Sequence, residues 1–202
     1  GVIRSTPLVI TVNKQPAPSF SIELLRTAIG AKWYTIHGSK KGIKGVQLGE
    51  SFIPTDSDGR IRIYFSPAYE ERRISALSVL NGDIPAGSLS DSLAIIGITG
   101  VGTMEADVKP TPITSRMDGV EIHAQVVENI LENSRLIRPQ HAIWTELGIF
   151  MLSGIILIIL LPRLNPGYGV AAFLLLSLLL FSTAVFIFAG TRILYDPSFP
   201  VF

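Results

Sequence analysis

The sequence contains no cysteine, and charged residues make up only 16% of its 202 residues. Without cysteine the chain can form no disulfide, no thiolate metal site and no cysteine nucleophile. Lysine and arginine together exceed aspartate and glutamate by one, so the chain lacks the basic surplus that is typical of nucleic-acid binding. We therefore expect no nucleic-acid partner, and no metal or other cofactor in this chain.

Charge is scarcest in two apolar runs, residues 142–161 and 168–190, and the second has no charged residue at all. About 20 helical residues cross a hydrocarbon core of about 30 Å. The intervening residues 162–167 contain two prolines and a glycine, which end one helix and begin the next. We predict two transmembrane helices in a lipid bilayer; the alternative is a buried hairpin of a soluble protein.

Glu146 is the only ionisable residue inside either run. An ionisable residue within a membrane is a candidate functional site. Glu146 lies near the start of its run and close to Trp144, as in the aromatic belts at membrane interfaces. We expect Trp144 and Glu146 to lie at the membrane interface, although a proton relay or ion site stays open for Glu146.

Neither end of the sequence looks natural. The chain begins at Gly1 without a signal-like leader, and it stops in the proline-broken stretch "YDPSFPVF". We expect a fragment that is incomplete at its N-terminus. Residues 191–202 would then be an extracytoplasmic loop before a missing helix.

The remaining residues, 1–141, show an alternation of short strand and helix patterns. A helix is predicted over 19–30, with Ser19 or Ser21 as its cap, Gly30 as its end and an apolar stripe of Phe20, Leu24, Leu25 and Ala28. A second, short helix is predicted over 74–82. Short β-rich runs are "PLVITV", "WYTIH" and "KGVQLG".

The stretch "FIPTDSDGRIRIYF" gives the clearest strand signal. Ile61, Ile63 and Phe65 alternate with Arg60, Arg62 and Tyr64, which predicts a half-buried strand. Asp56 and Asp58 suggest a calcium loop, but no third ligand stands at the right spacing. A simple Asx turn is the favoured interpretation.

The unbroken apolar run "SLAIIGIT" (92–99) is typical of a strand covered on both faces, as in a mainly parallel sheet. The order of elements predicts one α/β or α+β domain.

The glycine loop "GITGVG" (97–102) follows this run, where bare backbone amides can approach an anion. A nucleotide site would need a helix next, and Pro110 and Pro112 argue against one. We keep the loop as a ligand-lining candidate, with a purely structural loop as the alternative; its candidate residues are Gly97, Thr99, Gly100 and Gly102.

The stretch "MDGVEIHAQVVENIL" (117–131) predicts an amphipathic helix that begins near Asp118 and Gly119. His123 lies at the edge of the apolar face and is both a candidate ligand residue and a candidate packed, structural histidine. The predicted apolar face is Ile122, Val126, Val127, Ile130 and Leu131; the predicted solvated stripe is Glu121, Gln125, Glu128 and Glu132.

Taken in order, "FIPTDSDGRIRIYF", "ISALSVLNGDIPAGSLSDSLAIIGIT", a threonine-proline pair, "GVEIHAQVVENIL" and "LIRP" before apolar helices resemble the second CHASE family. These are sensory extracellular domains associated with cyclases and histidine kinases. The resemblance covers nearly the whole chain, most loosely over residues 1–50. Val101 to Met104 and the insertion "EADVK" depart from the family's loop, so no ligand residue is carried over.

The resemblance implies an extracytoplasmic sensor domain (1–141) for an unknown ligand, with 162–167 as a cytoplasmic loop. It also implies a multi-pass protein of the plasma membrane, in which the same chain carries a cytoplasmic output domain. That output would be an adenylate or guanylate cyclase, or a histidine or serine/threonine kinase. Receptors that signal in this way often form homodimers, so a homodimer is one expectation.

Charge alone favours the opposite topology. Arg163 is the only cation of the hairpin loop, whereas Arg135, Arg138 and Arg192 lie on the other side. Whole domains translocate largely regardless of charge, so we follow the resemblance. A membrane-anchored enzyme with a site around residues 97–102 and His123, and a scaffold protein, stay as alternative functions. We expect no catalytic residue in this chain.

Overall fold

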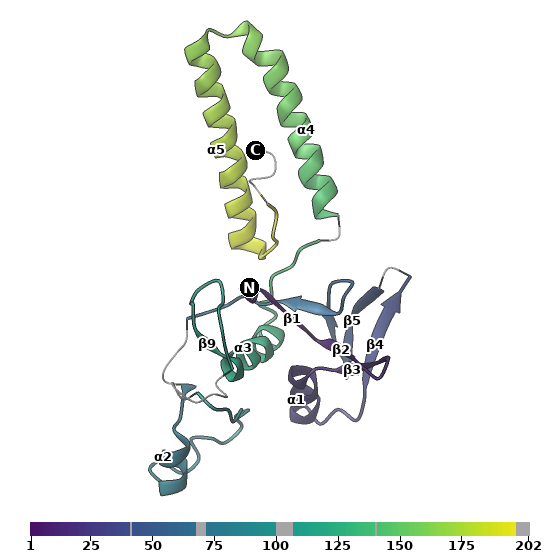
Figure 1. The fold of residues 1–202 in the computed structure, drawn as a ribbon, viewed down its shortest axis with the longest axis vertical. Coiled ribbons are helices and arrows are strands. Elements are labelled where there is room, and N and C mark those ends of the chain that lie inside the picture. Colours follow the sequence, from purple (N-terminus) through teal and green to yellow (C-terminus); the bar gives the residue numbers. More distant parts are fainter. Residues whose placement is uncertain (41, 68–71, 100–106, 140, 197–202) are drawn as a thin grey trace. The chain divides into compact units, whose positions relative to one another are not determined.

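The structure, a computed structural model, describes residues 1–40, 42–67, 72–99, 107–139 and 141–196 (Figure 1). It divides into two compact units, residues 1–135 and 136–202. The first unit mixes strands and helices, and the second contains two long helices.

The described strands of the first unit are all paired antiparallel, in four small sheets. The expected mainly parallel sheet is therefore wrong for these strands. Short turns join most of the paired strands, and such turns allow only antiparallel pairing. The sheets are β4 (Tyr34–Ser39), β5 (Gly42–Leu48) and β6 (Ser51–Pro54); β2 (Val9–Val12) and β3 (Gln15–Pro18); β1 (Ser5–Pro7) and β7 (Arg60–Arg62); and β8 (Val108–Lys109) and β9 (Met117–Asp118).

The turn that leads into β7 is the predicted Asx turn. The Oδ1 atom of Asp56 accepts hydrogen bonds from the backbone amides of Asp58 (3.0 Å) and Arg60 (2.8 Å). The alternation beyond the turn is also confirmed, because Ile61, Ile63 and Phe65 are buried.

Helix α1 (Phe20–Ala28) forms where the sequence predicts it, and its buried face includes part of the predicted apolar stripe, since Leu25 is buried and Leu24 packs against the core. Ser21, Ile22 and Leu25 are buried, whereas Phe20 and Ala28 of the predicted stripe are exposed. Ser19 occupies the cap position without making a side-chain cap bond.

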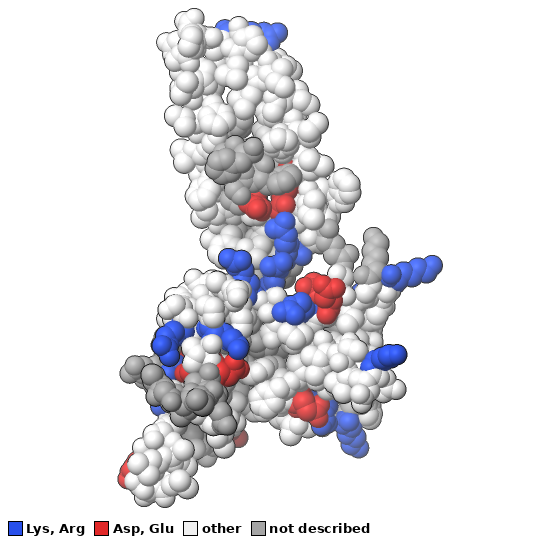
Figure 2. All heavy atoms as spheres, in the orientation of Figure 1, with Lys and Arg blue, Asp and Glu red and all other residues white. Residues whose placement is uncertain are grey.

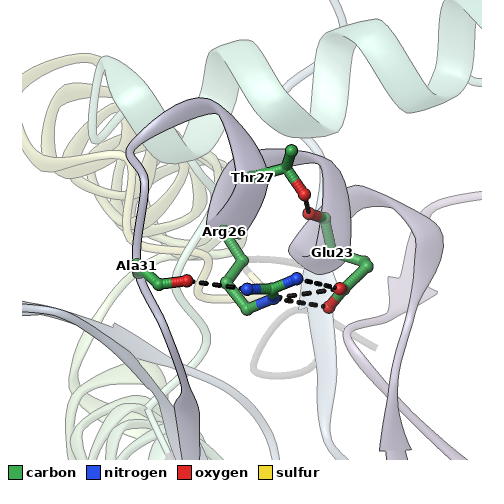
Figure 3. A network of polar contacts seen from close by, with 4 residues as sticks. All are labelled: Glu23, Arg26, Thr27 and Ala31. Carbon is green, nitrogen blue, oxygen red and sulfur yellow. Dashed lines mark hydrogen bonds and ion pairs between the residues drawn. The ribbon is translucent and has the colours of Figure 1, made fainter.

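A polar network closes the C-terminal end of α1 (Figure 3). The Arg26 guanidinium donates to both carboxylate oxygens of Glu23 and to the carbonyl of Ala31, at 2.7 Å for Ala31. The hydrogen bond from Arg26 lowers the pKa of Glu23 below its ordinary value. The network joins the helix to the segment that leads into β4.

The core of the first unit lies between α1, α3 (Gly119–Leu131) and the strands (Figure 1). Its residues are almost all aliphatic, and several are completely buried. They are Leu8, Val9, Ile22, Leu25, Val46, Leu48, Ile53, Ile61, Ile63, Phe65, Met117, Ile122, Val126 and Val127.

The segment between α2 and β8 differs from the prediction. Helix α2 (Ala76–Asn81) is present and ends at Gly82 in the left-handed conformation, as expected. Residues 92–99, however, form no strand, and Ile96 is 95% exposed. The prediction of a buried strand is wrong because apolar content alone does not supply a pairing partner, and no described strand pairs with this run.

The second unit consists of α4 (Ala142–Leu160), a short 3₁₀ helix η2 (Leu161–Arg163) and α5 (Pro166–Thr191). The two helical spans, Ala142–Arg163 and Pro166–Thr191, have mean hydropathies of 2.2 and 2.6, and both are long and apolar enough to cross a membrane. On the face of the two helices that Figure 2 shows, charged residues are almost absent between the helix ends. Their apolar side chains point outward all round, which is typical of helices surrounded by lipid rather than by protein.

Candidate functional site

Helix α3 holds the segment that follows β7 through two buried amide side chains, Gln125 and Asn129, which we call the amide pair. The Asn129 amide accepts from the backbone N–H of Tyr64 (2.7 Å) and donates to the carbonyl of the same residue (3.1 Å). Gln125 binds the N–H and carbonyl of Ser66 in the same way, at 3.1 and 2.9 Å. Both amides are less than 5% exposed.

The geometry of the amide pair follows from two periodicities. Residues four apart on a helix lie about 6 Å apart, and residues two apart on a strand face the same side at about 6.6 Å. Gln125 and Asn129 therefore match Ser66 and Tyr64 and replace the hydrogen bonds that a neighbouring strand would give.

The sequence interpretation placed Gln125 in the solvated stripe, and this is wrong. An amide side chain can be buried when it has hydrogen-bond partners in the protein. The spacing of apolar residues in the sequence does not show whether such a partner exists. Leu131 was likewise expected on the apolar face and is 63% exposed. The sequence interpretation did not single out Asn129. The one available signal for the amide pair was the spacing of two amide residues, four apart, beside the apolar face of the helix.

His123 extends from α3 and packs against the start of α1. Its Nδ1 atom lies 3.0 Å from the Ser21 hydroxyl, and its ring meets the edge of Phe20 at 5.1 Å between centroids. Burial lowers the pKa of His123, and the nearby Asp107 carboxylate opposes this effect. Ser21 is only 1% exposed, so its hydroxyl is closed to solvent, whereas His123 is half-buried.

The glycine-loop candidates are only partly described. Gly97 lies directly against α3, because a Cβ atom added to it would be 2.6 Å from Cβ of Val120. Thr99 is exposed, while Gly100 and Gly102 lie outside the described residues. The structure thus brings Gly97 to the first turn of α3, and a ligand role for this set stays a prediction.

The solvent side of α3 is held by arginines from one segment. Arg73 forms ion pairs with Glu121 and, at 3.4 Å, with Asp118; Arg72 pairs with Glu128 at 2.7 Å. Glu121 and Glu128, expected in a solvated stripe, are thereby partly covered, with side chains 14% and 23% exposed. Across the described ranges, no three His, Asp or Glu side chains gather as a metal site.

The second unit contains a polar cluster at the open end of its hairpin, which we call the hairpin clasp (Arg138, Glu146, Asp196 and the bridge Ile137–Ile193). Glu146 is 5% exposed, and its carboxylate accepts from the Arg138 guanidinium (2.9 Å) and from the backbone amide of Asp196 (2.8 Å). Ile137 and Ile193 form a parallel bridge beside it, with backbone bonds from Ile137 to Arg192 (3.1 Å) and from Leu194 to Ile137 (2.8 Å).

The clasp gives Glu146 a role that the sequence did not predict, namely joining the segment before α4 to the segment after α5. Trp144, two residues earlier, is 74% exposed. The interfacial position expected for both residues stays a prediction.

Comparison with known proteins gives one match. The family model described as the CHASE2 domain matches residues 1–162. This range includes the whole first unit and all of α4. No curated protein and no solved structure matches the chain.

Proposed function

The chain belongs to the CHASE2 family, whose domains are sensory and occur in signalling receptors, and on that premise we propose that it is the extracytoplasmic input module of a multi-pass receptor in the plasma membrane. Its first unit would bind a ligand, and its helical hairpin would pass the signal to a cytoplasmic output domain of the same chain. An adenylate or guanylate cyclase is the proposed output. A histidine or serine/threonine kinase is the alternative.

The observation that carries this proposal is the arrangement of α3. The amide pair and the arginine pairs fasten this helix to distant segments of the first unit, and only residues 132–141 separate it from α4. A change in the first unit that displaces α3 therefore reaches the first membrane helix through a short connection. A ligand can drive such a change only if its affinity differs between the two states.

The burial of Ser21 weighs against a membrane-anchored enzyme, since the one hydroxyl bound to His123 is closed to substrate. Under the enzyme hypothesis His123→Gln abolishes an activity; under the sensor hypothesis it changes stability or signalling only. A scaffold protein would require that no output domain follows.

Topology is tested by labelling. Because the chain has no cysteine, a single cysteine can be introduced as Ser57→Cys in the exposed turn between β6 and β7. It can then be probed with a membrane-impermeant maleimide in intact cells. We expect labelling without lysis, and Leu164→Cys in the hairpin loop should be labelled only after lysis. The reverse pattern would overturn the extracytoplasmic assignment.

The signalling role is tested by joining the chain to an adenylate cyclase catalytic domain and measuring cyclic AMP in membranes. We expect Asn129→Ala, which releases the strand segment from α3, to change the output relative to the unmodified fusion. A cyclase rate that is indifferent to this change would contradict coupling through α3.

A further inference from the structure

A cavity of about 290 Å³ lies at the start of α3 in the first unit. We propose that this cavity binds a small amphipathic anion, a carboxylate with a short apolar body; that it is the ligand site of the sensory module rests on the proposed function. Its wall combines two arginines, one glutamate and a hydroxyl with apolar side chains. The lining residues are Pro67, Arg73, Ile113, Thr114, Arg116, Met117 and Glu121.

Arg116 supplies the anion-binding group. It is exposed, and it forms no ion pair with any residue that the structure describes. Thr114 fixes its backbone, since the threonine hydroxyl accepts from the Arg116 amide (3.3 Å) and donates to its carbonyl (3.2 Å). A guanidinium on a fixed backbone can bind a carboxylate through two parallel hydrogen bonds.

The apolar lining of the cavity determines the chemistry of the uncharged part of the ligand. Met117 is 2% exposed and belongs to the core, while Ile113 is 48% exposed at the rim. A short hydrocarbon chain would cover Ile113 and gain about 25 cal/mol for each Å² of apolar surface removed from water. Small-molecule sites have volumes of roughly 300–1,000 Å³, and this cavity lies just below that range, so its ligand must be small.

Arg73 connects the cavity to α3. It already pairs with Glu121 and Asp118, which lie in and just before the first turn of the helix. A ligand carboxylate at Arg116 enters the same cavity and competes with these carboxylates for Arg73. Binding would therefore weaken one of the attachments of α3, which gives the ligand the different affinity for two states that signalling requires.

The test uses the whole chain in lipid nanodiscs, with ¹³C-methyl-labelled methionine and pentanoate as the probe. Met117 lines the cavity, and Met151 in α4 is the internal reference; Met117→Leu assigns the signal. We expect a saturable shift of the Met117 signal with pentanoate, and at least tenfold weaker binding of pentan-1-ol, which has the same chain without the charge.

Two variants sharpen the test. Arg116→Gln should weaken pentanoate binding at least tenfold, whereas Arg4→Gln, at an exposed arginine outside the cavity, should leave it unchanged. Arg116→Lys, which keeps the charge, should lie between them. Equal binding of the alcohol, unchanged binding by Arg116→Gln, or no saturable shift would overturn the proposal. Binding without any effect on the cyclase fusion would instead contradict the sensory function and leave the cavity assignment intact.

Discussion

Helix α3 and the helical hairpin of the second unit are held by the same kind of contact, a buried polar side chain bound to backbone far away in the sequence. In α3 the amide pair is neutral, and each amide satisfies both an N–H and a carbonyl. In the hairpin the Glu146 carboxylate only accepts, and one of its partners is the charged Arg138. The buried contacts of α3 therefore depend on hydrogen-bond geometry, whereas the buried contact that closes the hairpin depends on a charge.

The largest effect is expected from removing half of the amide pair. Asn129→Ala leaves the N–H and carbonyl of Tyr64 without this partner, and each such loss costs up to about 1–3 kcal/mol where the group is shielded from water. We expect the free energy of unfolding of the first unit to fall by about 2–4 kcal/mol, measured by denaturant titration with circular dichroism. Glu132→Ala, at the exposed end of α3, is the control; an equal loss in both variants would refute the role of the amide.

A second change tests how closely α3 is packed. Gly97→Ala places a methyl group 2.6 Å from Cβ of Val120, and such overpacking costs about 1–3 kcal/mol. Gly38→Ala, whose added Cβ meets nothing within 4 Å, should lack this steric penalty. The cost should shrink when Val120→Gly, which removes the clashing Cβ atom itself, is added, and a cost that persists unchanged would show that the contact with α3 is not its cause.

The hairpin clasp is tested by crosslinking. With Ile137→Cys and Ile193→Cys as the only cysteines, the bridged pair should form a disulfide under mild oxidation. Glu146→Gln removes the charge that holds Arg138, which is 30% exposed in its side chain, so we expect a loss of about 1–2 kcal/mol and a several-fold lower crosslinking rate. Thr145→Gln, next to it, should crosslink normally; a rate unaffected by Glu146→Gln would separate the closure of the hairpin from this charge.

The smallest effect is a dependence of stability on pH. Burial lowers the pKa of His123 in the folded unit, so the unfolded chain, with a histidine pKa of about 6.5, binds the proton more readily. The contribution is fully present above about pH 6.5 and is lost as the pH falls from there toward the lower pKa of the folded state. His123→Gln should flatten the pH profile of unfolding below pH 6.5, and an identical slope in both proteins would assign it to other groups.

Sequence patterns predicted the elements that are defined by local chemistry. Long apolar runs predicted the two long helices, and an aspartate predicted the Asx turn at Asp56. A glycine predicted the end of α2 at Gly82. These features need no knowledge of the rest of the fold.

The failures are features decided by a distant partner. Residues 92–99 lack the strand neighbour that their composition suggested, and Gln125 is buried because the Ser66 backbone satisfies it. The clasp is a similar case, since Glu146 meets an amide 50 residues away. Ligand roles for Gly97, Thr99 and His123 stay predictions, because a single chain shows what these residues contact but not what they bind.

The hairpin clasp turns the second unit into a closed ring rather than an open fork. The loop after α4 joins one end of the two helices, and the Ile137–Ile193 bridge joins the other. In a ring, neither helix can rotate about its own axis or slide along its neighbour without straining the opposite junction. A displacement at residue 137 is therefore expected to reach residue 193 directly through the bridge, as well as along the two helices.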